Sequence, residues 1–419
     1  KSLPFPRSSR YSTIYSIKLA EDMSEFEEKA VEETPEEDTS LANSDVTTKY
    51  QEAAKIANAT MLEVMAMCVP DARVLDICVA GDAAIMEKTS LIFRSKKGAK
   101  VEKGVAFPVC LSVNNCVCHY SPLASDESTV LALGDLVKLD LGVHVDGYIA
   151  VAAHTFRVTA TGGQLAALEE GQESVTGPAA DVMNAAYTAA EVAARMIKPG
   201  NTNKQVAEAV KSVAEAFGVT TMAGTVMHQM KRFVIDASKV IILRDDSDKK
   251  VDTCTFEAGE VYAVDVCFTT GEGKPREENA RTTLFKRNVD KSYSLRMKAS
   301  RAFFSEVQKS APTMPFTLRT VEDERQAKLG VRECVQHELL TPYPVLFERP
   351  DTVVAHVKFT VLLLPSGTAK VTGVELPAGM YVSDADKVVS EELQALLAEE
   401  MGSKKKKKNK KKKAASEKA

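Results

Sequence analysis

KLDLGVHVDG, residues 138–147, is the most informative stretch of this 419-residue chain. Apolar residues alternate with polar or small ones as far as Asp146-Gly147, a dipeptide that favours a two-residue hairpin turn. The pattern predicts strands at Leu136 to Val145 and Tyr148 to Val158, with paired residue numbers that sum to 293. Asp140 and Val151 are then diagonal neighbours on one face, about 7–8 Å apart at the backbone.

Outward from this hairpin, the pattern of helices followed by strands occurs twice, which predicts an α+β fold of two halves. The predicted helices are Val46 to Met65, Ala72 to Phe93, Ala179 to Ile197, Asn203 to Phe217, a block from Ser292 to Leu340 broken at Pro312 and Pro315, and Ala385 to Met401. The other predicted strands are 104–113, 233–243, 260–269, 281–286 and 353–364.

The composition is that of a soluble protein with a sizeable core. Hydrophobic residues make up 44% and charged residues 27%, which excludes disorder of the whole chain. No apolar run reaches the roughly 18 residues of a membrane-spanning helix, so membrane insertion is not expected. None of the eight cysteines forms a C-x-x-C pair, which argues against a zinc knuckle and favours a reducing compartment.

The charge is concentrated at the two ends, although the net charge is only −4. Residues 21–38 hold ten acidic residues and one lysine, so 1–44 are expected to form a disordered acidic tail, and 1–22 to lie upstream of a true start at Met23. Residues 402–419 form a basic tail, for which RNA phosphates are the first expected partner and a solubilising role the alternative. Its lysines are Lys404, Lys405, Lys406, Lys407, Lys408, Lys410, Lys411, Lys412 and Lys413.

Two further segments are candidates for binding partners. A second basic cluster, with RNA contact or a solvated helix face as its alternatives, comprises Lys286, Arg287, Lys291, Arg296, Lys298 and Arg301. In the last predicted helix, Leu393, Leu396 and Leu397 form a Leu-x-x-Leu-Leu motif. That spacing suits a helix bound in a groove, but packing within the protein is favoured because any amphipathic helix shows it.

Two more motifs extend the argument to a family. NNCVCHYSP at 114–122 follows the first strand, and EVYAVD at 260–265 forms a later one. With the hairpin, they resemble the aminopeptidases of the pita-bread fold, most closely methionine aminopeptidase type 2. The resemblance runs from Val46 to Leu364 and includes a type 2 helical insertion at about 292–346 that ends in Pro342-Tyr343-Pro344.

The resemblance implies a site with two metal ions held by two Asp, one His and two Glu, beside a His that contacts the substrate. At the corresponding positions this chain has His119 on the substrate side, then Asp140, Val151, His228, Asp265 and Lys358. Valine offers no ligand atom, and a lysine ammonium has only donors. We therefore expect no metal, no cofactor and no peptidase activity, and we expect Lys358 to pair with Asp140, Asp265 or both because a buried unpaired charge is costly.

A type 2 fold with this altered site and charged ends is similar to the proliferation-associated protein 2G4 family, also called the ErbB-3-binding protein family. The resemblance implies a monomeric, non-catalytic protein of cytoplasm, nucleus and nucleolus. It would bind rRNA, other RNA and the ribosome near the tunnel exit, and act in ribosome biogenesis, translation and growth control. Residual metal-dependent methionyl aminopeptidase activity is one alternative, and a transcriptional or receptor-linked interaction protein is another. The expected domains are 45–383 for the aminopeptidase-like fold, 384–401 for the last helix and 402–419 for the basic tail.

Overall fold

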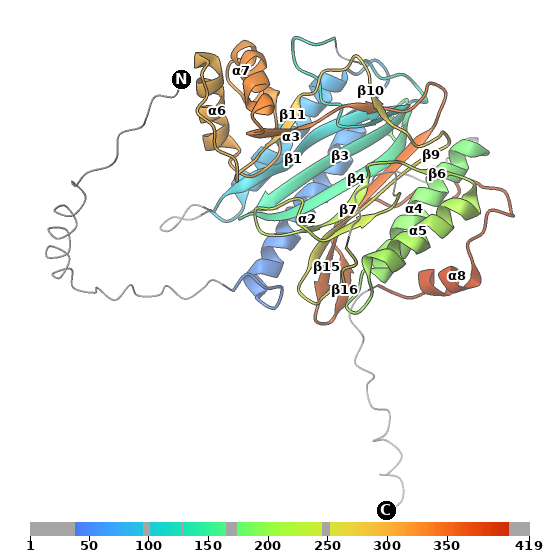
Figure 1. Ribbon diagram of the computed structural model, residues 1–419. Coiled ribbons are helices and arrows are strands. Elements are labelled where there is room, and N and C mark those ends of the chain that lie inside the picture. The colour runs from blue at the N-terminus through green and yellow to red at the C-terminus, as the bar shows by residue number, and fades with distance from the viewer. Residues whose placement is uncertain (1–37, 95–100, 128, 165–173, 245–251, 402–419) are drawn as a thin grey trace, which may run out of the picture. The chain divides into compact units, whose positions relative to one another are not determined.

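An antiparallel sheet of ten strands organises the described part of the chain (Figure 1). The computed structural model describes residues 38–94, 101–127, 129–164, 174–244 and 252–401. Neighbouring strands follow the order β1-β3-β4-β15-β9-β7-β8, and β5, β6 and β16 pair with strands of that path. The strands are β1 Lys103–Val113, β3 Leu136–Val145, β4 Tyr148–Thr159, β5 Gly162–Gly163, β6 Thr220–Thr221, β7 Val226–Met230, β8 Val240–Ile242, β9 Val261–Thr269, β15 Val354–Leu364 and β16 Gly367–Lys370.

The predicted hairpin is confirmed in its turn and in its register. Val145 pairs with Tyr148 and Gly142 with Val151. Asp146 and Gly147 both have positive φ, at 55° and 77°, as a two-residue type I′ turn requires. The Asp146 carboxylate also accepts from Lys49 at 2.6 Å and Arg232 at 2.8 Å, so the turn is tied to both halves of the chain.

Four helices cover one face of the sheet. They are α2 Ser44–Met67, α3 Val74–Leu91, α4 Pro178–Met196 and α5 Asn203–Phe217. Val137 and Leu139 of β3 belong to one buried cluster with α2 and α3, and Val264 and Val266 of β9 belong to another with α4 and α5. Because side chains alternate along a strand, the intervening residues of β3 and β9 point to the opposite face, where the candidate site lies.

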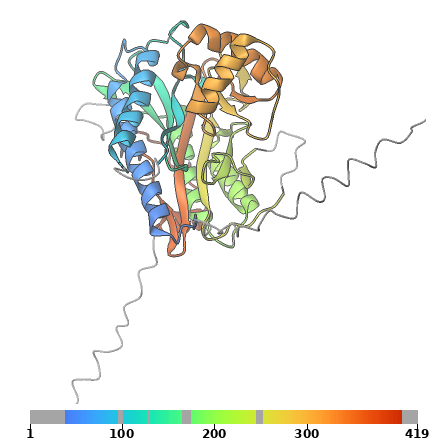
Figure 2. The same cartoon turned by 90° about the vertical axis from the view of Figure 1, so that its left-hand side faces the viewer.

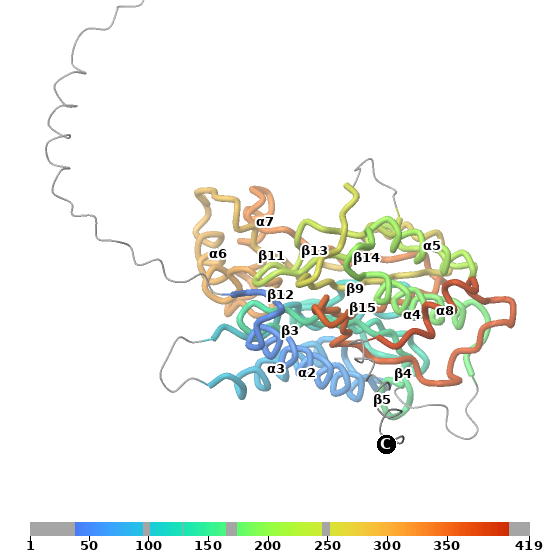
Figure 3. Tube along the Cα trace, turned by 90° about the horizontal axis from the view of Figure 1, so that it is seen from below, coloured from blue at the N-terminus to red at the C-terminus, as the bar shows by residue number. Residues whose placement is uncertain are grey.

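The insertion is built from two helices and short strands. The elements of this region are β10 Arg276–Glu277, β11 Leu284–Arg287, α6 Lys298–Ser310, β12 Phe316–Thr317, the 3-10 helix η1 Leu318–Thr320, α7 Glu324–Gln336, β13 Leu340–Tyr343 and β14 Leu346–Phe347. Strand β14 pairs with β2 Cys116–Cys118, which comes from the first half of the chain. Figure 2 shows α6 and α7 together at one end of the sheet. In Figure 3, α2 and α3 lie on one side of the first strands, and α6 and α7 on the other.

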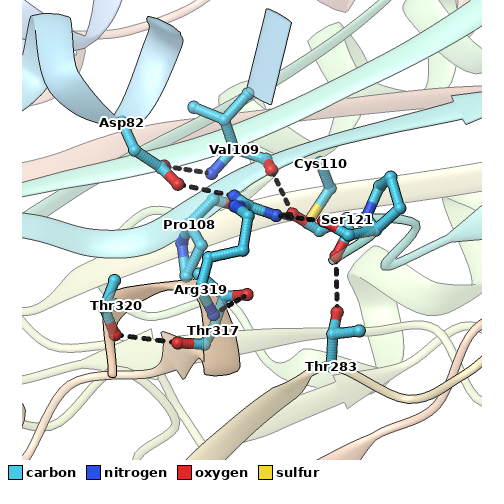
Figure 4. A network of polar contacts seen from close by, with 10 residues as sticks. Asp82, Pro108, Val109, Cys110, Ser121, Thr283, Thr317, Arg319 and Thr320 are labelled. Atoms are coloured by element: carbon cyan, nitrogen blue, oxygen red, sulfur yellow. Dashed lines mark hydrogen bonds and ion pairs between the residues drawn. The ribbon is translucent and has the colours of Figure 1, made fainter. Parts of the chain in front are cut away.

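Arg319 in η1 fixes this insertion to the first half of the fold (Figure 4). Its guanidinium donates to Asp82 of α3 at 2.6 Å and to the hydroxyl of Ser121 at 2.6 Å. The other Asp82 oxygen accepts from the Val109 amide at 2.8 Å, and the Ser121 hydroxyl donates to the Val109 carbonyl at 2.7 Å. This closed set of bonds holds α3, β1 and the segment after His119 in one arrangement.

Several predicted elements differ from the structure. The apolar run at 233–243 is not one strand: Phe233 has a positive φ of 61° and Lys231 bridges to Val234, so a turn separates β7 from β8. The block from Ser292 to Leu340 holds only α6 and α7 as α-helices, because Phe316–Thr317 pairs with β11. The last helix is not Ala385 to Met401: α8 spans Glu391–Leu397, and the Ser390 hydroxyl caps it by accepting from the Leu393 amide.

The folded part of the chain begins earlier than the predicted end of the acidic tail. Leu41 was assigned to the acidic tail, but it is only 5% exposed and packs with Val46 and Tyr50. Residues 38–44 of that tail are described, and Ser44 begins α2, whereas 1–37 and the basic tail at 402–419 lie outside the described residues. The described residues from Thr39 to Met401 form one compact unit, and none of their helices is long and apolar enough to cross a membrane.

Candidate functional site

Four adjacent strands place the candidate residues in one row across the sheet. Asp140 of β3 pairs with Ala153 of β4, Ala153 pairs with Lys358 of β15, and Lys358 pairs with Asp265 of β9. Val151 lies two residues from Ala153, on the same face. The sheet register therefore brings together residues that are far apart in the sequence.

Lys358 bridges the two carboxylates, as the sequence predicts. Its Nζ lies 2.7 Å from Oδ2 of Asp140 and 3.1 Å from Oδ2 of Asp265. Burial alone would lower the pKa of Lys358, but the adjacent negative charges of Asp140 and Asp265 outweigh it and raise that pKa above its ordinary value. Lys358 is thus an ammonium ion that neutralises part of the negative charge left in the pocket.

His356 is a member of this cluster that the sequence analysis did not identify. Its Nε2 lies 2.8 Å from Oδ1 of Asp265. Burial opposes the effect, but Lys358 and His356 together hold the pKa of Asp265 well below its usual range. A charged carboxylate only accepts, so Nε2 of His356 is the donor. The signal was available, because His356 and Lys358 are two residues apart on one strand and so share a face.

His119 and His228 complete the polar side of the pocket. His119 has a positive φ of 65°, and its Nδ1 donates to the Pro344 carbonyl at 2.9 Å. Burial lowers the pKa of His119 to about 4. His228 lies on β7, and burial also lowers its pKa. Both imidazoles are therefore neutral near pH 7.

These side chains line a pocket of about 310 Å³, called the Lys358 pocket below. Its apolar wall is formed by Phe107, Val151, Met222, Ile235 and Leu346. Val151 is only 2% exposed, so the position that would carry a second Asp in the aminopeptidases presents an aliphatic surface. Asp236, also in the lining, pairs with Lys286 of β11.

The residues present do not fit the pair of metal ions that the fold implies. Among the described residues, no group of three or more His, Cys, Asp or Glu side chains is placed to hold a metal ion. Lys358 donates to both carboxylates that remain, and Val151 has no ligand atom. The pocket lies at the positions that the sequence resemblance assigns to the metal ions, but its side chains are bonded to one another.

The basic cluster at 286–301 is partly used within the fold. Lys286 pairs with Asp236 and Lys291 with Glu338, Arg287 donates to the Pro312 carbonyl, and Arg301 donates to the Leu295 and Arg296 carbonyls. Within the described residues, the side chains of Arg296 and Lys298 are exposed and enter no hydrogen bond or ion pair. Arg296 and Lys298 are thus the two of the six predicted residues whose side chains have no partner within the described part of the fold.

Two further arginines of the insertion, which were not predicted from the sequence, are also exposed. Arg325 and Arg332 are exposed on α7 and lie seven residues apart, so they share one helix face. Buried Glu333, next to Arg332, accepts from the Arg296 amide at 2.8 Å and the Met297 amide at 3.2 Å. This contact places the start of α6 beside α7. We call Arg296, Lys298, Arg325 and Arg332 the basic face of the insertion.

The two other predicted interaction segments are the Leu-x-x-Leu-Leu motif and the lysine-rich tail. Leu393 is 8% exposed, and Leu396 and Leu397 pack against the same buried cluster, so the Leu-x-x-Leu-Leu motif forms internal contacts in α8. Lys404 to Lys413 lie outside the described residues.

Comparison with known proteins agrees with this geometry. The model of metallopeptidase family M24 matches residues 48–284. The chain is 49% identical over 342 residues to ErbB-3 binding protein 1 of Solanum tuberosum, covering 81% of this chain and 84% of that protein. It is 42% identical over 376 residues to proliferation-associated protein A of Dictyostelium discoideum, covering 90% and 94%. The solved structure of a thermophilic Arx1 has a TM-score of 0.78 and 29% identity, covering 86% of this chain and 99% of that chain.

The matched family confirms the predicted pita-bread fold, in which a helix-covered sheet presents its site on the opposite face. The identity to the first two relatives is far above the level at which only the fold would be shared, and it extends over most of each chain. This chain therefore belongs to the proliferation-associated protein 2G4, or ErbB-3-binding protein, family within metallopeptidase family M24.

Proposed function

We propose that this protein is a non-catalytic member of its family that binds RNA and ribosomes. Its expected place on the ribosome is near the tunnel exit, with roles in ribosome biogenesis, translation and growth control, in cytoplasm, nucleus and nucleolus. The observation that carries the loss of catalysis is the Lys358 ammonium lying 2.7 Å from Asp140 and 3.1 Å from Asp265.

The chemical reason is that the pocket has no means of activating water. A metallopeptidase uses bound metal ions to lower the pKa of water to about 7 and to polarise the scissile carbonyl. Lys358 engages the two carboxylates that would hold such ions, and its positive charge repels them. Neutral His119 cannot replace both functions.

Metal analysis and a cleavage assay test this part of the proposal. The purified full chain is dialysed against manganese or cobalt, analysed for bound metal, and assayed with a methionyl peptide. We expect neither stoichiometric metal nor release of methionine. Turnover that a chelator abolishes would instead support the alternative of an active aminopeptidase with rearranged ligands.

The basic face of the insertion supports the RNA-binding part. Arg296, Lys298, Arg325 and Arg332 present positive charge without an ion-pair partner among the described residues. Arginine and lysine side chains in such numbers bind phosphates and release counterions. The nine lysines of residues 404–413 would add to the same effect.

Ribosome co-sedimentation over a range of salt concentrations tests the insertion. The variant carries Arg325→Ala and Arg332→Ala. Its control carries Lys204→Ala and Lys211→Ala, which removes two exposed cations with the same seven-residue spacing from α5. We expect the first pair to reduce the log–log salt slope by about 1.5, since each phosphate contact contributes roughly 0.7–0.9. Equal slopes for both variants would exclude this face from the interface.

Removal of residues 402–419 tests the tail in the same assay. If the lysines contact phosphates, binding weakens and its salt dependence becomes shallower. Unchanged affinity and slope would leave the tail with the solubilising role.

A further inference from the structure

The Lys358 pocket contains buried polar atoms that nothing in the described chain satisfies. Oδ1 of Asp140 is buried without a partner, and the whole residue is only 5% exposed. Nδ1 of His228 is also buried without a partner. Since Nδ1 of His119 donates to Pro344, the other ring nitrogen of the neutral imidazole is an acceptor as well. Buried polar groups normally have partners, so this set points to a ligand.

The charged donor of the same pocket already faces the two carboxylates. Lys358 donates to Asp140 and Asp265, and His356 donates to the second oxygen of Asp265. A ligand that fits must therefore bring N–H donors.

The charge of the pocket has the same implication. The carboxylates of Asp140 and Asp265 outnumber the one ammonium, that of Lys358, by one. Asp236 at the pocket is balanced by Lys286 and does not change this balance. An anionic ligand would be repelled, whereas a single positive charge would be attracted.

The apolar wall indicates what carries that charge. Phe107, Val151, Met222, Ile235 and Leu346 line the space beside the acceptors. An unbranched methylene chain can be buried against such a wall at no polar cost. A peptide N-terminus is a poorer fit, because the carbonyl next to its ammonium costs more to desolvate against an apolar wall than a methylene group does.

We propose that the Lys358 pocket binds a primary ammonium on an unbranched methylene chain, with the ammonium donating to Asp140 and to the imidazoles of His119 and His228. Two sources share this chemistry: a free alkyl diamine, and the side chain of a lysine in a polypeptide. The proposal does not depend on RNA binding, and neither does its test.

Isothermal titration calorimetry of the full chain at pH 7.5 separates the possible ligands. The probes are putrescine, Nα-acetyl-lysine-N-methylamide, methioninamide and 1-butanol, which has a similar chain without the charge. We expect putrescine, the lysine derivative or both to bind at least about tenfold more tightly than methioninamide, and 1-butanol not to bind. The tighter of the first two identifies the source. Equal or tighter binding of methioninamide, or binding of no amine, would overturn the proposal.

Variants locate the binding site. Ala223→Phe and, separately, Val226→Phe fill the pocket without removing a charged group, since both residues line it. Ala124→Phe is the matched control, because Ala124 lines a different groove beside α3. Melting temperatures identify any variant that fails to fold. We expect each folded pocket variant to bind the amine at least about tenfold more weakly and the control to bind as the wild type does. Undiminished binding by a folded pocket variant would place the amine elsewhere and overturn the proposal.

Discussion

Two buried cations of this protein illustrate different uses of an ion pair. Around Arg319, both oxygens of Asp82 have partners, and the guanidinium also bonds to Ser121 and Pro122 (Figure 4). Around Lys358, Oδ1 of Asp140 has none among the described residues. The first group is satisfied within the fold and stabilises it. The second lies in a pocket and keeps bonding capacity for a ligand.

The largest expected effect comes from breaking the satisfied pair. Arg319→Met removes the only cation that bonds to Asp82 among the described residues and leaves that carboxylate buried. Loss of one partner of a buried pair costs about 3–5 kcal/mol. Urea unfolding measures the change in the free energy of unfolding. Lys328→Met is the control, because it breaks the more exposed pair with Glu324, where about 0–1 kcal/mol is expected. Similar losses in both variants would mean that Arg319 does not hold the insertion.

A smaller effect is expected from Lys358→Met, because water can enter the pocket and solvate the carboxylates. We expect a loss of about 1–3 kcal/mol at neutral pH from leaving these buried acceptors without their donor. Urea unfolding at pH 7 measures it, with Lys239→Met, which breaks a pair at the margin of the second half, as control. No loss at all would mean that the bridge contributes nothing to the fold.

The same variant should reverse the pH dependence of stability that this site contributes. In the wild type the pKa of Asp265 is depressed, so the stability it contributes is present above the ordinary Asp value of about 3.9 and is lost as the pH falls further. Without Lys358, the repulsion between Asp140 and Asp265 raises the pKa of one of them, and protonation then favours the folded state. Lys358→Met should therefore recover stability between pH 7 and pH 5. If the free energy of unfolding of the variant changes between pH 7 and pH 5 just as that of the wild type does, the pairing is contradicted.

An effect that vanishes at neutral pH concerns the histidine beneath the hairpin turn. His144 is 4% exposed, and burial lowers its pKa to about 4. The unfolded chain takes up a proton near pH 6.5, so stability is complete above that pH and is lost as the pH falls towards 4. Each such histidine contributes a slope of about 1.4 kcal/mol per pH unit in that window. His144→Gln should remove one such step from the unfolding free energy measured between pH 6.5 and 5. A slope identical to that of the wild type would show that His144 does not titrate there.

Strong local patterns made much of this structure predictable from sequence. Asp146-Gly147 fixed the register of the hairpin, and the register placed Asp140 and Val151 on one face, as observed. The pairing of Lys358 with both carboxylates followed from charge balance and is confirmed. The resemblance to the aminopeptidases identified which positions along the chain form the site.

Some elements and ion pairs could not be predicted from the sequence, because tertiary contacts outweigh the local pattern there. The apolar residues near Phe233 read as part of a strand, yet the Phe233 amide bonds to the Gly147 carbonyl and the chain turns there. Strand β7, which carries His228, was missed because only five residues form it. Charge density in the insertion did not show which cations are paired, since Asp236 and Glu338 lie far away in sequence from their partners.

The row of Asp140, Ala153, Lys358 and Asp265 has a consequence for protein design. Backbone pairing of four strands holds these positions, so their spacing does not depend on which side chains occupy them. The helices on the other face supply the stability through separate buried clusters. A library varied at 140, 153, 358 and 265 could therefore search for new binding chemistries on the same backbone.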